Sequence, residues 1–135
     1  MKFIEPIDVA TAVVRKKGTE KYLLAKRTKE TDIQPGKWNF PGGKIEKKDS
    51  KPSGAAQREL FEETEIEEQP VRTGESFMVN TVDGKFRVHP VLFKTEEEPE
   101  LNSEHTEHRW IKSEQLDEFQ TVKGLKQDLR RLDNM

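Results

Sequence analysis

A run of glutamates follows a Pro-Gly-Gly sequence near the middle of the chain. Its members are Glu59, Glu62, Glu63, Glu65, Glu67 and Glu68. Like charges three or four residues apart on a helix repel one another. A divalent cation would reverse the sign of that interaction, because Mg²⁺ prefers carboxylate oxygens and takes substrate phosphates as further ligands. The segment therefore indicates a candidate site for a divalent cation.

A helix over residues 52–64 would bring three of these carboxylates together. Each helical residue advances about 100° around the axis. With Arg58 at zero, the carboxylates fall at roughly 40°, 100° and 140° for Glu62, Glu59 and Glu63. The helix can therefore present them on one face, with the arginine at its edge.

Two readings of this helix are possible. Glutamate-rich helices are usually only solvated faces. The preceding Gly42-Gly43 pair, which we expect to form a turn, favours the metal site, because glycines let backbone carbonyls approach the same ion. The proline at the helix start, Pro52, and the Arg58-Glu59 pair favour it as well.

The elements around this helix predict a single layered domain over residues 1–135. Strands are predicted at 7–16, 22–27, 38–40 and 108–112, the first two as a hairpin. Asp83-Gly84 predicts a second hairpin between 71–82 and 86–95. Loops are expected at 28–37 and 96–107, and short helices at 113–119 and 121–132. Strands mixed with a few helices give an α/β (α+β) fold.

Composition excludes several classes of protein. The chain has no cysteine, so disulfides and thiolate sites are excluded. Its net charge of −2 gives no strong nucleic-acid signal, because such binders carry a strongly basic face. No apolar run is long enough to span a membrane, and we expect a cytoplasmic protein, a monomer or a homodimer.

The residues resemble the signature of the Nudix hydrolases, the Nudix box. Gly43 matches its first glycine, Arg58-Glu59-Leu60 and Glu62-Glu63 match in register, and Ile66 matches its last apolar position. The resemblance extends to the early hairpin and to the stretch from Glu104 to Leu116, and so covers most of the chain. It implies a mixed sheet sandwiched between helices, with the box as a loop–helix–loop metal motif.

The chain departs from the box at two positions. Asp49 lies at the right distance from Gly43 to replace the first glutamate, but counting back from Arg58 places Ser50 there. We predict that Asp49 takes the role, because that position supplies a charge. Glu65 stands where the box has a glycine, and a glutamate is strained there if the helix end needs a positive φ.

The resemblance implies Mg²⁺- or Mn²⁺-dependent hydrolysis of a nucleoside diphosphate linked to another group. The implied metal ligands are Glu59, Glu62, Glu63 and a carbonyl from Gly42 or Gly43. Arg58 would orient the carboxylates. The general base would be Glu59 or a glutamate of the acidic loop, Glu104 or Glu107.

The substrate is less constrained than the chemistry. Relatives that cleave ADP-ribose tend to carry a proline at a particular distance beyond the box, and those that cleave dinucleoside polyphosphates a tyrosine near there; the corresponding region of this chain, 79–86, contains neither. We therefore expect a MutT-like pyrophosphatase that converts a nucleoside triphosphate, oxidised or not, to the monophosphate. The alternatives are an enzyme acting on RNA 5′ ends and a non-catalytic nucleotide sensor.

The remaining candidates concern contacts with the substrate and packing in the core. Lys44, Arg27, Phe40 and Asp49 are the candidate substrate contacts, although core packing is favoured for Phe40 and Trp38. We interpret His105 and His108 as surface residues and His89 as structural.

Overall fold

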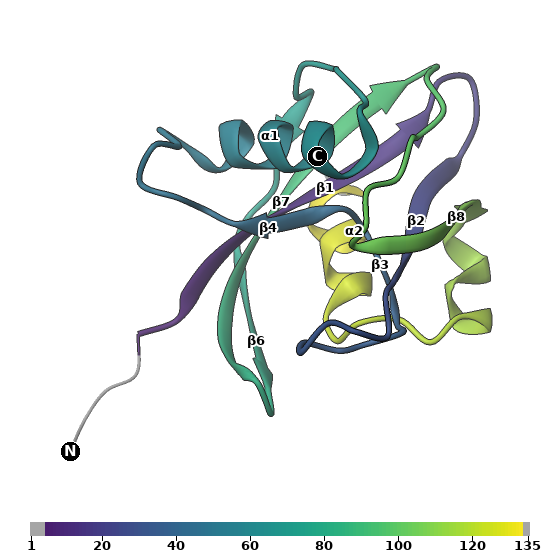
Figure 1. The fold of residues 1–135 in the computed structure, drawn as a ribbon. Helices are drawn as coiled ribbons and strands as arrows, with labels where there is room; N and C mark the ends of the chain where they lie inside the picture. The colour runs from purple at the N-terminus through teal and green to yellow at the C-terminus, as the bar shows by residue number, and fades with distance from the viewer. Residues whose placement is uncertain (1–4, 134–135) are drawn as a thin grey trace.

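The structure, a computed structural model, describes residues 5–133 (Figure 1). Its central pair of strands is β1 (Ile7–Lys16) and β7 (Gly84–Thr95), which run parallel from Ile7↔Phe86 to Lys16↔Thr95. The two edges of this pair carry β4 (Gly42–Lys44) on β1, and β5 (Arg72–Thr73) with β6 (Phe77–Thr81) on β7. A second group joins β2 (Lys21–Arg27) to β3 (Trp38–Asn39) and β8 (His105–Lys112).

Two helices cover opposite faces of the sheet (Figure 1). Side chains alternate along β1, so Ala10, Ala12 and Val14 pack with Leu60 of α1 (Pro52–Thr64). Val13 points the other way and packs with the leucines of α2 (Leu125–Asp133), near the 3₁₀ helix η1 (Ser113–Glu118). The predicted mixed sheet sandwiched between helices is confirmed.

The predicted hairpin between 7–16 and 22–27 is wrong for most of its length. β1 and β2 pair only at Arg15↔Tyr22, next to their turn. Beyond that point the strands separate, and the backbone N–H of Ala12 donates to the Pro41 carbonyl at 2.7 Å. The opening between the strands is where the segment leading to the glutamate helix enters the fold.

Gly42 and Gly43 lie in a strand rather than in a turn. They pair with Thr11 and Ala10 of β1. A Cβ on Gly42 would lie 2.3 Å from the carbonyl oxygen of Ala10, so no larger residue fits there. Gly42 is explained by this close packing against β1.

Other boundaries differ by a few residues. The acidic loop ends at Glu104, because β8 begins at His105 and not at residue 108. The region 71–82 splits into β5 and β6, and the last helix begins at Leu125 after a turn. The hairpin at Asp83-Gly84 and the helix over 52–64 are confirmed.

Helix α1 ends at Thr64 and is capped by Glu65, whose φ of 61° lies in the left-handed region. Its backbone N–H donates to the Phe61 carbonyl at 2.8 Å, which closes the helix. This conformation costs about 1 kcal/mol or more for a residue with a Cβ. The glutamate at the glycine position of the box is therefore strained.

We expect Glu65→Gly to raise the free energy of unfolding by about 0.5–1 kcal/mol. The gain from removing the backbone strain in the folded state should exceed the cost of a more flexible unfolded chain. Urea unfolding would measure it. Glu67→Gly is the matched control: it also removes an exposed glutamate just after the helix, but at a position without positive φ, and should not stabilise. Equal effects of the two variants would contradict the assignment of strain.

Candidate metal centre and substrate cavity

Helix α1 holds its three glutamates at three depths. Glu63 is buried, with 2% of its surface exposed, and its Oε2 accepts from the backbone N–H of Gly42 at 3.2 Å. Glu59 is partly buried, whereas the Glu62 side chain is 52% exposed. Burial, the adjacent Glu59 and the charge of Glu104 raise the pKa of Glu63 well above its usual value.

Strand β4 sets the distance between the sheet and these carboxylates. A Cβ on Gly43 would lie 2.6 Å from Cδ of Glu59. Any side chain at Gly43 would therefore push the carboxylate away. The pair of glycines brings the β4 backbone directly against the acidic face of α1.

Arg58 is clamped by the loop before the helix. Its Nε and Nη2 donate to Asp49 Oδ1 and Oδ2 at 3.2 and 2.9 Å, and its Nη1 donates to Glu59 Oε1 at 2.8 Å. The Arg58 guanidinium holds the pKa of Asp49 below its usual value. Asp49, with a side chain only 6% exposed, thus occupies the place facing the arginine for which Ser50 was the alternative.

The loop after β7 brings a fourth carboxylate to the cluster. Asn102 binds the end of α1 through its N–H to the Glu63 carbonyl and its amide to the Glu62 carbonyl, at 3.0 and 3.1 Å. This anchor places Glu104 beside Glu63. Partial burial and the charge of Glu59 raise the pKa of Glu104.

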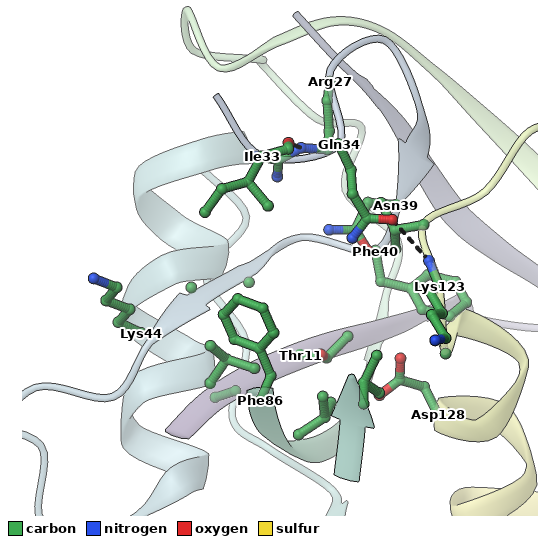
Figure 2. A pocket seen from close by; sticks show the side chains of 18 of the residues that line it. Thr11, Arg27, Ile33, Gln34, Asn39, Phe40, Lys44, Phe86, Lys123 and Asp128 are labelled. Carbon is green, nitrogen blue, oxygen red and sulfur yellow. Dashed lines mark hydrogen bonds between the residues drawn. The ribbon is translucent and has the colours of Figure 1, made fainter. Parts of the chain in front are cut away.

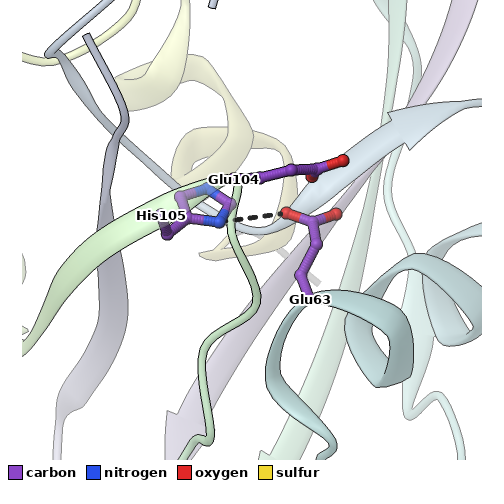
Figure 3. Close-up of side chains that lie close together, drawn as sticks. All are labelled: Glu63, Glu104 and His105. Atoms are coloured by element: carbon purple, nitrogen blue, oxygen red, sulfur yellow. Dashed lines mark ion pairs between the residues drawn. The ribbon is translucent and has the colours of Figure 1, made fainter. Parts of the chain in front are cut away.

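His105 also points into this cluster, as Figure 3 shows. Its Nδ1 lies 3.6 Å from Oε1 of Glu63, and neither ring nitrogen has a hydrogen-bond partner among the described residues. Burial and the charge of Arg27 lower its pKa to about 4, so the ring is neutral near pH 7. Glu63, Glu104 and His105 offer ligand atoms within 4.8 Å of one another, a group that could hold a metal ion.

The interpretation of His105 as a surface residue is therefore wrong. The reason is a register shift between β2 and β8, where Lys26 pairs with Glu107 and Arg27 with His105. Such an irregularity changes the direction of the side chains beyond it. His105 turns inward, whereas Glu107 on the same strand pairs with Arg109 at 3.1 Å, away from the cluster.

The other two histidines behave as the sequence indicates. His108 is partly exposed and lies 3.8 Å from Glu98. His89 Nε2 lies 2.9 Å from Oδ1 of Asp8, a contact between β7 and β1 that has a structural role.

A cavity of about 480 Å³ opens beside the acidic cluster (Figure 2). Among the predicted site residues it is lined by Glu59, Glu104, Arg27, Lys44, Phe40 and the two glycines. Phe40 is fully buried and packs in the core, so its ring forms part of the cavity wall. Asp49, Glu62 and Glu107 do not line this cavity.

Asp128 of α2 also lines the cavity and was missed. A signal was present in the sequence. Leu125, Leu129 and Leu132 form the apolar stripe of the helix, and Asp128 falls on that stripe. Acidic side chains are rarely fully buried, so an acid at such a position indicates a special role.

The comparisons agree with this geometry. The model of the NUDIX domain matches residues 6–132, so the chain belongs to the NUDIX family and is a pyrophosphohydrolase. Three similar solved structures are a MutT protein from Methanosarcina mazei Go1, an Ap4A hydrolase from C. elegans and the ORF135 protein of E. coli. Their sequence identities are 24%, 20% and 25%, and their TM-scores 0.79, 0.76 and 0.72. The alignments cover 98%, 95% and 97% of this chain and 97%, 96% and 91% of those chains.

Within residues 5–133, no helix is long and apolar enough to cross a bilayer.

We expect Asp49→Asn to lower kcat/KM by about tenfold, because a neutral amide holds the Arg58 fork less firmly. Its stability deficit at pH 7 should shrink as the pH falls through the pKa of Asp49, below 3.8, since that carboxylate stabilises the fold only while ionised. Activity assays and urea unfolding between pH 7 and pH 3 would test this.

Ser50→Ala is the matched control. It changes the neighbouring residue, to which the other alignment gives the role, and should leave kcat/KM at the wild-type value. A silent Asp49→Asn, or a Ser50→Ala variant with the larger loss, would overturn the assignment.

Proposed function

We propose that the protein hydrolyses a nucleoside triphosphate to the monophosphate and pyrophosphate, using Mg²⁺ or Mn²⁺. One observation carries the proposal: a single cavity joins the carboxylates Glu59 and Glu104 to an apolar region that includes Val79 and Phe86. A cavity of this size and mixed lining suits a small ligand with an apolar body and a charged end. A nucleotide has that form.

The donor set fits a divalent cation. Glu63 lies buried beside Glu59 and Glu104, and burial and these charges raise its pKa. Such a cluster is unfavourable without positive charge, and binding of a cation would release the proton and offset the repulsion. We expect Glu59, Glu62 and Glu63, with a carbonyl of Gly42 or Gly43, to supply ligands. Glu104 and His105 are further candidates.

The bound cation would neutralise the diphosphate and make the attacking water more acidic. The residues of the chain do the rest. Arg27 and Lys44 face the cavity and can pair with phosphate oxygens. Water forms a bond to phosphorus as the anhydride bond breaks, and pyrophosphate leaves with the bonding electrons. The proton of the water passes to Glu104 or to Glu59.

The similar solved structures do not decide which group is released from the substrate. Besides the Ap4A hydrolase, they include a bifunctional NMN adenylyltransferase/ADP ribose pyrophosphatase from Francisella tularensis, of which this chain covers 42%. The absence of a proline or a tyrosine from residues 79–86 supports the triphosphate. A hydrolysis screen over nucleotides, with phosphate and pyrophosphate measured separately, tests the proposal; release of pyrophosphate from none of them overturns it.

We expect Glu59→Gln and Glu63→Gln each to lower kcat by about 10² or more, because both keep the shape and remove a charged ligand. Added Mg²⁺ or Mn²⁺ should raise the Tm of the wild type, and raise that of either variant less. Glu67→Gln, an exposed change outside the cavity, should match the wild type in both measurements. Near-normal kcat and a full metal-induced shift in both test variants would refute the metal site.

The two loop candidates for the general base can be separated. Glu104 lines the cavity, whereas Glu107 pairs with Arg109 and does not line it. Glu104→Gln should lower kcat by about tenfold or more and flatten the acidic limb of the pH–rate profile. Glu107→Gln should leave both unchanged. The reverse order would exclude Glu104 as the base.

A further inference from the structure

His105, the first residue of β8, is a buried side chain whose polar atoms have no partner. Its side chain is 2% exposed, and neither Nδ1 nor Nε2 makes a hydrogen bond in the part of the chain that the structure describes. A neutral imidazole offers one N–H donor and one acceptor nitrogen. Because buried groups of this kind are normally paired, two unpaired ring nitrogens call for an explanation.

The carboxylate of Glu63 does not supply the missing hydrogen bond. Nδ1 of His105 lies 3.6 Å from Oε1 of Glu63, which is too long for one (Figure 3). The other oxygen of this carboxylate, Oε2, accepts from the backbone N–H of Gly42 at 3.2 Å. The ring and the carboxylate are therefore held close together without a direct bond between them.

The separation of these two groups suits a metal ion that they share. In octahedral coordination at about 2.1 Å, adjacent ligand atoms lie about 3 Å apart and opposite ones about 4 Å. The 3.6 Å between Nδ1 and Oε1 falls between these values. Glu104 offers a third ligand atom, and all three lie within 4.8 Å of one another. Burial favours the neutral form of the ring, which is the form that binds metals.

A short turn before β8 holds the three groups in place. Asn102 accepts from the backbone N–H of Glu104 through its Oδ1 at 3.0 Å, and from that of His105 through its carbonyl at 3.4 Å. Its own N–H donates to the Glu63 carbonyl at the end of α1. One residue therefore positions the backbone of all three candidate ligands. Contacts of this kind orient the side chains that bind a metal.

A nitrogen ligand changes which ion is preferred. Mg²⁺ takes oxygen ligands, whereas imidazole suits first-row transition metals, and for a given site affinity rises from Mn²⁺ to Co²⁺. An ion can approach from the cavity, because Glu104 lines it although Glu63 and His105 do not. The cluster therefore combines an open side with a buried nitrogen donor.

We propose that His105 is a nitrogen ligand of the ion held by Glu63 and Glu104, so that this centre binds transition-metal ions such as Mn²⁺ and Co²⁺ in preference to Mg²⁺. The inference rests on the divalent cation of the proposed function and adds to that centre a ligand from outside the glutamate helix. It explains why a histidine with unpaired nitrogens is buried against two carboxylates.

Pulsed electron paramagnetic resonance of bound Mn²⁺ tests the ligand directly. The nitrogen of a coordinated imidazole couples to the electron spin of the ion, and labelling histidine with ¹⁵N changes the coupling pattern. We expect this histidine coupling in wild-type protein. Its absence there overturns the proposal, and because this measurement needs no substitution, it does not depend on the folding of a variant.

Two variants assign the coupling to one histidine. His105→Asn should abolish it. His108→Gln is the matched control, because His108 lies on the same strand but is partly exposed and 3.8 Å from Glu98, and it should keep the coupling. Coupling that persists in His105→Asn overturns the proposal.

Calorimetric titration of metal-free protein measures the preference between ions. His105→Asn should weaken Co²⁺ binding by about tenfold or more and Mg²⁺ binding by less than about threefold, because an amide oxygen replaces the nitrogen donor. His108→Gln should bind both ions as the wild type does. Equal losses for the two ions in His105→Asn indicate a purely structural role and overturn the proposal.

The outcome for the general reaction is read separately. Protein that releases pyrophosphate from triphosphates with Mg²⁺ but shows no histidine coupling with Mn²⁺ overturns this inference alone. Histidine coupling in a protein that releases pyrophosphate from no nucleotide supports the ligand and overturns the proposed function. Protein that binds no divalent cation overturns both.

Discussion

The site depends on keeping the carboxylate of Glu63 buried beside two other carboxylates. In isolation this arrangement is unfavourable, because burial and like charge both oppose ionisation. The fold maintains it by packing α1 against β4, where Gly42 donates to Glu63 and Gly43 leaves room for Glu59. Since β4 in turn pairs with the central strand β1, the acidic cluster is supported by the most extensively paired part of the sheet.

The same constraint explains the arginine clamp. Arg58 is positioned by Asp49 and in turn holds the carboxylate of Glu59, so that the loop before α1 fixes a group on the helix. A bidentate pair restricts direction as well as distance. The extra loop residue is accommodated before α1 begins at Pro52, and the spacing of the helix carboxylates is unaffected. The loop can therefore vary in length while the acidic cluster keeps its geometry.

Local signals were sufficient for the helix but not for the strands around it. Pro52, the apolar spacing and the glutamate register predict α1 and the shared face of its carboxylates. Gly42-Gly43 was interpreted as a turn because the strand it forms depends on β1, a partner more than thirty residues away along the chain. The inward direction of His105 depends likewise on a register shift between β2 and β8 that no local pattern encodes.

The two sides of the cavity carry acids in different surroundings. On the α1 side several carboxylates gather, and a divalent cation bound there would turn their repulsion into affinity. On the α2 side a single buried acid, Asp128, has one oxygen that is unpaired among the described residues. Burying an acid without a full set of partners costs stability on either side. The helices that carry these acids, α1 and α2, pack against opposite faces of β1 and so hold them in place.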